Sequence, residues 1–319
     1  MTRSQHTKLS VSALLAISAL SLGSSALAAS AIEEPVTVID IPADPGAPVI
    51  ATVMMSSHRY RMIVDTGAGN LIFHLPVARR DLVAVPMDDS MLAQAKGIYG
   101  DLALHHFKAG SMSVGQWRFE PDENVFALDM NQAAEKYAVD GLLGVPYLAK
   151  LSWHWDNRSR KLLGYEHASS TVAAVRARLH CEPLYDVDAI PGVALKVGDE
   201  RALFALDTGD LGASGGLHPN DREALAYFGA IRAGGMNNSQ TDLAGKSQSS
   251  LQVSQIQNIM LGPTRLDGLV LTEVQSSSSL GRRFLSKFDE VLLDFGANTF
   301  CIPAVQQVEP DDISLYLSK

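Results

Sequence analysis

Cysteine is scarce in this chain of 319 residues, which contains only Cys181 and Cys301. Two cysteines are too few for the cysteine-rich sites that hold structural zinc. The histidines are scattered, and the adjacent pair His105 and His106 lacks the spacing by which two ligands face one metal. We therefore expect no metal site and no cofactor. The two cysteines either form a disulfide bridge or remain as two buried thiols.

Basic residues are also few, since 26 Lys and Arg stand against 35 Asp and Glu and give a net charge of −9. No block of basic residues occurs along the chain. Proteins that bind nucleic acid neutralise phosphates with a Lys- and Arg-rich surface. The composition therefore argues against a nucleic-acid partner.

A long apolar run is missing, because the stretch Val11–Leu22 is broken by serines and is too short to span a membrane comfortably. This stretch follows Arg3 and Lys8 and is itself followed by the small residues of Ala26-Leu27-Ala28. That order is typical of a signal peptide. We expect residues 1–28 to be removed after Ala28, the alternative being an uncleaved anchor. The mature protein is then expected to be periplasmic or secreted, with no membrane association.

The chain does contain a pattern that is written twice. Asp65-Thr66-Gly67 follows the apolar run "MIV", and Asp207-Thr208-Gly209 follows "FAL". The stretch "SMSVGQWRF" matches "NIMLGPTRL", and Leu142-Leu143-Gly144 matches Ser279-Leu280-Gly281, in the same order and at similar distances from the aspartate. We also align the segment from Pro35 with the segment from Pro183. Repetition of several elements in one order indicates a duplicated structural unit.

Most of the sequence predicts short β-strands, rich in Val, Ile, Leu and Phe and separated by Gly, Pro, Asn and Asp. Helices are expected only at Met91–Lys96 and Asp221–Arg232, with short turns near Tyr147 and Phe284. We predict an all-β protein of two domains, residues 29–170 and 171–319, each with one Asp-Thr-Gly. The joining segment Ser169–Cys181 is compatible with helix or strand.

"VDTGAGNLIF" resembles the active-site stretch of the pepsin-like and retropepsin-like aspartic peptidases, and the two apolar-Gly segments resemble that family's crossing strands. The resemblance implies two homologous acid-protease-like β-barrel lobes with the active site in a cleft between them. It assigns Asp65 and Asp207 as the catalytic pair. Thr66 and Thr208 would hydrogen-bond across the interface between the lobes, and Gly67 and Gly209 would allow the tight turns.

Two carboxyl groups within hydrogen-bond distance cannot both ionise easily, so one keeps a proton while the other stays charged. The charged member can take a proton from water, and the protonated member can donate toward a peptide carbonyl. This chemistry needs neither a metal nor a covalent intermediate.

Four further residues bear on this interpretation. Tyr99, within "GIYGD" (Gly97–Asp101), is a candidate for an aromatic residue on a flap over the cleft, or is an ordinary surface aromatic. Asp210 departs from the family pattern, which places Ser, Thr or Ala there, and a third carboxylate is expected to move the pH optimum upward. Asp156 and Asp294 are interpreted as turn or strand-end residues.

The leading hypothesis is an exported aspartic endopeptidase, monomeric, that binds an extended peptide or protein substrate by adding it as a strand. The alternative is a catalytically inactive module with the same fold that binds or inhibits through a peptide, which Asp210 and the irregular stretch "GGMNNSQTDLAGKSQSS" favour. A plain ligand-binding β-protein is a third interpretation, but it ignores the repeat.

Overall fold

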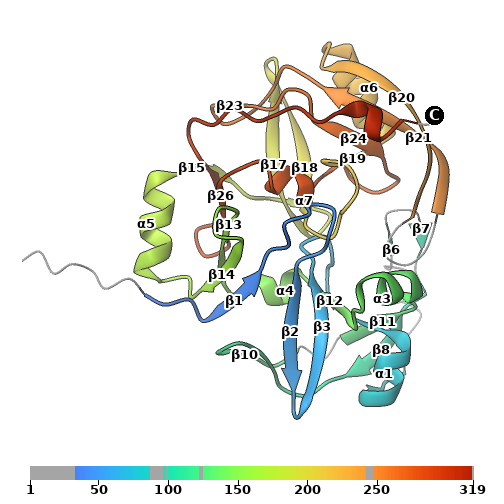
Figure 1. Cartoon of the computed structure of the whole chain (residues 1–319), viewed down its shortest axis with the longest axis vertical. Coiled ribbons are helices and arrows are strands. Elements are labelled where there is room, and N and C mark those ends of the chain that lie inside the picture. Colours follow the sequence, from blue (N-terminus) through green and yellow to red (C-terminus); the bar gives the residue numbers. More distant parts are fainter. Residues whose placement is uncertain are drawn as a thin grey trace, which may run out of the picture. The chain divides into compact units, whose positions relative to one another are not determined.

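The computed structural model describes residues 33–86, 96–97, 100–101, 103–121, 125–241 and 247–317. The described chain is mainly β, which confirms the predicted class (Figure 1). Its strands form four larger sheets and one two-stranded ribbon, β6 (Lys96–Gly97) with β7 (Gly100–Asp101). The signal-peptide segment, residues 91–95 of the helix expected at Met91–Lys96 and the flap candidate Tyr99 lie outside the described residues, whereas Lys96 belongs to strand β6 and not to a helix.

The first Asp-Thr-Gly belongs to a nine-stranded sheet of order β10-β9-β2-β3-β12-β4-β11-β8-β5. The hairpin of β2 and β3 brings the chain to Asp65, and β12 runs parallel to β3 with Leu143 opposite Val64. The strands are β2 (Ile50–Met55), β3 (His58–Val64), β4 (Leu71–His74), β5 (Val83–Ala84), β8 (His105–Lys108), β9 (Met112–Val114), β10 (Trp117–Phe119), β11 (Val125–Leu128) and β12 (Gly141–Leu143).

The second Asp-Thr-Gly repeats this local topology, but its strands are divided between two sheets. One has the order β23-β22-β17-β18-β25, with β16 also paired to β17, and the other has the order β19-β24-β21-β20. The strands are β16 (Tyr185–Val187), β17 (Ile190–Val197), β18 (Glu200–Asp207), β19 (Gly215–Leu217), β20 (Ile231–Thr241), β21 (Ser247–Ile256), β22 (Ile259–Leu261), β23 (Thr264–Arg265), β24 (Val270–Glu273) and β25 (Ser279–Gly281).

A six-stranded sheet takes strands from both copies, in the order β1-β14-β13-β26-β27-β15. Its central pair is antiparallel, with His154 opposite Leu292. The strands are β1 (Thr37–Asp40), β13 (Ser152–Asp156), β14 (Lys161–Tyr165), β15 (His180–Pro183), β26 (Glu290–Asp294) and β27 (Thr299–Ile302).

This sheet corrects one part of the predicted repeat. The edge position of β1 in the first copy is taken in the second copy by β15, which ends at Pro183. The alignment of the Pro35 segment with the segment that starts at Pro183 is therefore wrong. The stretch after Pro183 forms the additional strand β16, which the first copy does not show among its described residues. The paired hairpins at Gly115 and Gly262 are confirmed, and both glycines have a left-handed φ, of 61° and 55°.

The helices are short and lie mostly between strands. They are α1 (Leu75–Asp81), α3 (Asn131–Tyr137), α4 (Val145–Leu148), α5 (Ser170–Arg178), α6 (Pro219–Tyr227), α7 (Arg282–Leu285) and the 3-10 turn η1 (Ile313–Leu315). None of the helices in the described residues is long and apolar enough to cross a membrane. The turns predicted near Tyr147 and Phe284 are confirmed as α4 and α7.

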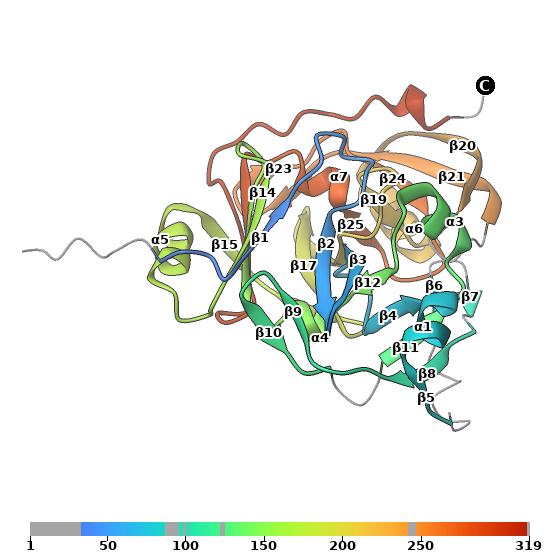
Figure 2. The same cartoon turned by 60° about the horizontal axis from the view of Figure 1, so that its bottom comes forward.

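The segment that joins the two copies is a helix, which answers the question left open by its sequence. Helix α5 begins after Ser169, whose side chain accepts a hydrogen bond from the Thr171 N–H. It contacts β13, β15 and β26 of the shared sheet (Figures 1 and 2). The predicted helix to Arg232 ends early instead, because Gly229 adopts a left-handed φ of 67° and β20 starts at Ile231.

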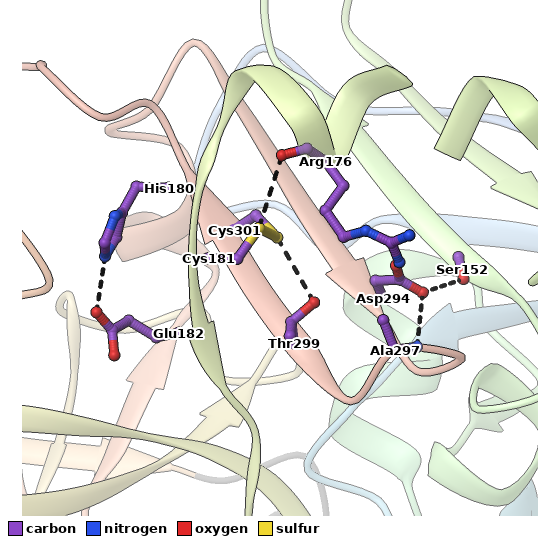
Figure 3. The surroundings of a disulfide bond; sticks show 9 residues. All are labelled: Ser152, Arg176, His180, Cys181, Glu182, Asp294, Ala297, Thr299 and Cys301. Atoms are coloured by element: carbon purple, nitrogen blue, oxygen red, sulfur yellow. Dashed lines mark hydrogen bonds and ion pairs between the residues drawn. A yellow bond between two sulfur atoms is a disulfide. The ribbon is translucent and has the colours of Figure 1, made fainter. Parts of the chain in front are cut away.

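Cys181 and Cys301 form a disulfide (Figure 3). They lie opposite each other on β15 and β27 of the shared sheet. The bridge is consistent with an oxidising location outside the cytoplasm.

Candidate functional site

Asp65 stands where a buried strand ends. The residues before it, Met62 to Val64, are buried, and the Asp65 N–H donates to the Leu143 carbonyl on β12 at 3.1 Å. Beyond the turn, the Val145 N–H donates to the Ala68 carbonyl at 2.8 Å. The crossing strand therefore holds the aspartate loop on both sides, and Asp65 is 5% exposed.

Asp207 occupies the corresponding place at the end of β18, opposite Gly281 on β25. Its loop is closed by hydrogen bonds from the Asp210 N–H to the Asp207 carbonyl and from the Arg282 N–H to the Asp210 carbonyl, at 3.1 and 3.0 Å. The crossing strand β25 carries Ser279 where β12 of the first copy carries the apolar Leu142. The Ser279 hydroxyl accepts a hydrogen bond from the Gly216 N–H at 3.0 Å, which ties this strand to β19.

Thr66 and Thr208 join the two loops although they are 142 residues apart. Each threonine N–H donates to the other's Oγ1 at 3.0 Å. Each hydroxyl donates to a carbonyl of the opposite strand, from Thr66 to Leu206 at 2.6 Å and from Thr208 to Val64 at 2.7 Å. Both threonines are buried, so these four bonds fix the loops relative to each other.

The carboxyl groups of Asp65 and Asp207 are thereby brought into hydrogen-bond contact. The Gly67 N–H donates to the Asp65 carboxylate at 2.8 Å, and the Gly209 N–H donates to the Asp207 carboxylate at 3.0 Å. A Cβ atom on Gly67 would lie 2.3 Å from Asp207, and one on Gly209 would lie 2.5 Å from Asp65. Only glycine fits at these two positions.

Burial raises the pKa of Asp65 well above its usual range, and the neighbouring charge of Asp207 raises it further. Burial likewise raises the pKa of Asp207, while hydrogen bonds from Asp65, Gly209 and Asp210 act in the opposite direction. The two groups titrate as a pair. One proton is therefore shared by the pair at pH values where two separate carboxyl groups would both be ionised.

Asp210 adds a third carboxyl group to the site. It is 8% exposed and accepts the Gly212 N–H at 3.0 Å. Burial, followed by the charge of Asp207, raises its pKa to about 7. Near neutral pH, Asp210 is therefore partly protonated, and its ionisation acts directly on the pair.

The other aspartates singled out in the sequence lie away from this pair. Asp156 ends β13 and binds the Ser159 hydroxyl at 2.6 Å. Asp294 ends β26, is fully buried and pairs with Arg176 at 2.6 Å (Figure 3). The His154 side chain on the same strand β13 contacts the Glu290 carboxylate at 2.8 Å. In the described parts of the chain, no three His, Cys, Asp or Glu side chains are grouped as metal ligands.

A serine-hydrolase pattern also occurs close to the second aspartate, since Gly212 to Gly216 has the spacing Gly-x-Ser-x-Gly. Ser214 is 0% exposed, however, and its hydroxyl donates to the Asp311 carboxylate at 2.6 Å. A strand follows this serine instead of the helix that the hydrolase turn requires. Ser214 is therefore a structural residue, not a nucleophile.

One residue near the site was not anticipated. Arg282, the first residue of α7, is 1% exposed. Its guanidinium donates to the carbonyls of Pro42 and Asp44, at 2.8 and 3.1 Å, and so attaches the β1–β2 loop to the crossing motif. Burial lowers its pKa to about 10. Nothing in the sequence distinguishes this arginine from an exposed one.

The sequence matches no protein-family model and no curated protein.

Proposed function

We propose that this protein is an aspartic endopeptidase in which Asp65 and Asp207 activate a water molecule. The observation that carries the proposal is the set of reciprocal hydrogen bonds between Thr66 and Thr208, because it holds two buried carboxyl groups in contact. The finer architecture belongs to the same proposal: two related β lobes, residues 29–170 and 171–319, with the substrate cleft between them.

In the proposed reaction, the ionised carboxylate takes a proton from a water molecule while the water oxygen attacks the peptide carbonyl carbon. The protonated carboxyl group donates its proton to the carbonyl oxygen, which forms a neutral tetrahedral intermediate. The carbon–nitrogen bond then breaks as a proton passes from the pair to the departing amine. A hydroxyl of the intermediate returns its proton to the pair as the new carboxyl group forms, so the pair again shares one proton.

The proposed substrate is an extended peptide or protein segment that adds to the site as a strand, with alternate side chains in apolar pockets. The segment Gly97–Asp101, where β6 and β7 pair, is the proposed flap. The disulfide supports an exported protein, periplasmic or secreted. We call each Asp-Thr-Gly loop with its crossing strand a half-site. The presence of both half-sites in one chain supports a monomeric enzyme.

The test is cleavage of a mixed peptide library from pH 3 to pH 7 by the mature protein, followed by mass spectrometry. Asp65→Asn should abolish cleavage, because an amide neither accepts the water proton nor shares one with Asp207. Asp156→Asn is the matched control, since Asp156 ends a strand of the shared sheet, and should cleave like the wild type. Equal cleavage by wild type and Asp65→Asn would refute the proposal.

A second candidate is a peptide-binding or inhibitory module with the same pair but no turnover. Asp210 favours it, since a third buried carboxyl group next to Asp207 disturbs the balance in which one member is charged and one is neutral. Peptides that bind tightly at every pH without being cleaved would support this candidate.

A further inference from the structure

The segment from Asp311 to Leu317 returns to the loop that follows the second Asp-Thr-Gly. The Asp311 carboxylate accepts the Ser214 hydroxyl at 2.6 Å and the Val270 N–H at 2.8 Å through one oxygen. Its other oxygen pairs with the Lys287 ammonium at 2.7 Å. The two charged side chains are only 7% and 11% exposed. Asp311 is thus the centre of a buried polar cluster that joins three parts of the chain.

Contacts on both sides keep Asp311 in this place. Its N–H donates to the Gly268 carbonyl, and its carbonyl accepts the Gln255 side chain, each at 2.9 Å. The apolar residues that follow pack on a small cluster behind the same loop, with Ile313, Tyr316 and Leu317 against Ala213, Val253 and Val270. The segment is therefore anchored by charge at one end and by apolar contacts at the other.

Two hydrogen bonds and one strand pairing connect Asp311 with Asp207. Ser214, held through its hydroxyl, also donates its N–H to the Val270 carbonyl at 2.9 Å. The Ser214 carbonyl in turn accepts the Gly281 N–H at 2.8 Å. Gly281 lies opposite Asp207 in the parallel pair of β18 and β25. Any shift of Ser214 is therefore transmitted to the strand that supports Asp207.

The first aspartate loop is held in a different way. There, β4 pairs with the crossing strand β12, with Gly141 opposite Phe73 and Leu142 opposite Ile72. The corresponding strands of the second copy, β19 and β25, belong to separate sheets and form no such ladder in the described structure. Two bonds join them instead, from the Gly216 N–H to the Ser279 hydroxyl and from the Gly281 N–H to the carbonyl of Ser214, the residue before β19. Asp311 holds Ser214. The Asp65 loop is thus supported by backbone pairing between β4 and β12, whereas the Asp207 loop is supported in part by the side chain of Asp311.

We propose that Asp311 is a positioning residue that holds the Asp207 loop in place through Ser214, and that residues 311–317 are part of the second half-site. The catalytic part of this inference rests on the proposed peptidase function. The part that concerns the loop depends only on the contacts, and it is measured without any substrate.

The experiment compares Asp311→Asn with Asp294→Asn in the full chain. Asp294 is a matched control because it is also a buried carboxylate that binds a serine hydroxyl and a cation, Ser152 and Arg176, but in the shared sheet (Figure 3). Amide hydrogen exchange is followed in peptides that cover residues 208–217 and 279–282. Ser214→Ala, which removes only one hydroxyl and leaves the Asp311–Lys287 pair intact, is used as the milder variant.

Both aspartate substitutions should lower the melting temperature, whereas only Asp311→Asn and Ser214→Ala should speed exchange in the two peptides, by roughly ten- to a hundredfold. If the wild type is a peptidase, Asp311→Asn should also lower kcat by roughly tenfold with little change in KM.

The outcomes separate the two proposals. Exchange no faster in Asp311→Asn and Ser214→Ala than in Asp294→Asn would overturn the positioning role, whatever the activity. If the Asp311→Asn and Ser214→Ala variants exchange faster but the wild type cleaves no peptide, the positioning role is supported and the peptidase function is rejected. If the wild type cleaves peptides and Asp311→Asn has the same kcat, only the claim that Asp311 affects catalysis would be overturned.

Discussion

Two glycines set how closely Asp65 and Asp207 approach each other. Each glycine follows an Asp-Thr pair, donates its N–H to its own aspartate and faces the opposite carboxyl group. A side chain at either position would occupy the space of that carboxyl group, so the requirement comes from the partner loop and not from the turn itself. The backbone of one half-site is in this way shaped by the side chain of the other.

Gly209→Ala should therefore separate the carboxyl groups, because the new Cβ would lie 2.5 Å from the Asp65 Cγ. Displacement of a reacting group by about 1 Å costs on the order of a hundredfold in rate, so if the protein is the peptidase proposed above we expect at least this loss in kcat/KM. Gly69→Ala is the control, since a Cβ there meets no atom within 4 Å. Similar activity of the two variants would contradict the close contact of the pair.

Asp210 makes the stability of the fold depend on pH. Its pKa is raised from 3.8 to about 7, so the folded chain keeps a proton that the unfolded chain has already lost. Stability from this group is fully present below about pH 4 and is lost as the pH rises through 7. Asp210→Asn, which stays neutral, should therefore gain stability over the wild type between pH 4 and pH 8, by on the order of a few kcal/mol.

Urea unfolding at several pH values across this range measures the effect. Asp65 and Asp207 also titrate, and their charge acts on Asp210, so the difference between the two proteins measures Asp210 together with its effect on the pair. A difference that stays constant with pH would show that Asp210 is ionised in the same way in the folded and unfolded chains. With a cleavable peptide, the pH–rate profile of Asp210→Ala should move toward lower pH, because a nearby negative charge has been removed.

Among the elements, β15 and β27 form one edge of the shared sheet and are linked by the disulfide Cys181–Cys301. The bridge closes a loop of 120 residues that contains Asp207 and its crossing strand β25. Replacement of both cysteines by alanine should lower the free energy of unfolding by roughly 2–5 kcal/mol, since the unfolded chain gains freedom. If the protein is the peptidase proposed above, cleavage well below the melting temperature should persist, because the threonine bonds are untouched.

Denaturation with and without a reducing agent tests this prediction. Reduction should destabilise the wild type by about as much as the double substitution does, and it should have no effect on the substituted protein. A wild-type protein whose unfolding is insensitive to reduction would argue that the bridge does not form.

The elements that could be predicted from the sequence are those with a local cause. The apolar run before each Asp-Thr-Gly, and the hairpin turns at Gly115 and Gly262, fix the structure of their own neighbourhood and were interpreted correctly. The reciprocal threonine contacts followed from the resemblance to a known family and agree with the structure. The end of α6 was missed because the chain has no polar or Pro signal there, and only Gly229 marks the stop.

The features that could not be predicted depend on partners far apart in the chain. The alignment of β1 with a strand after Pro183 failed because sequence similarity does not show which strand pairs with β27. Arg282 and Asp311 look like surface charges in the sequence. Their burial depends on backbone carbonyls or on a lysine supplied by distant segments, for which local patterns give no signal.

At the scale of the whole molecule, several contacts among the described residues join the two copies of the repeat. The shared sheet pairs β13 with β26 over five residues, the threonines bond across the loops, and Arg282 binds the β1–β2 loop. One apolar cluster also contains residues of both copies, such as Val64 and Leu206. Neither copy can therefore unfold without exposing surface and polar groups of the other.

We accordingly expect a single cooperative unfolding transition. In scanning calorimetry, the calorimetric enthalpy should equal the van't Hoff enthalpy, as it does when no intermediate is populated. Arg282→Met should lower the melting temperature without splitting the transition, because the shared sheet and the threonine bonds still join the copies. Two separate transitions in the wild type would mean that the copies unfold as independent units, and the joint burial of Asp65 and Asp207 would then be lost before the chain is fully unfolded.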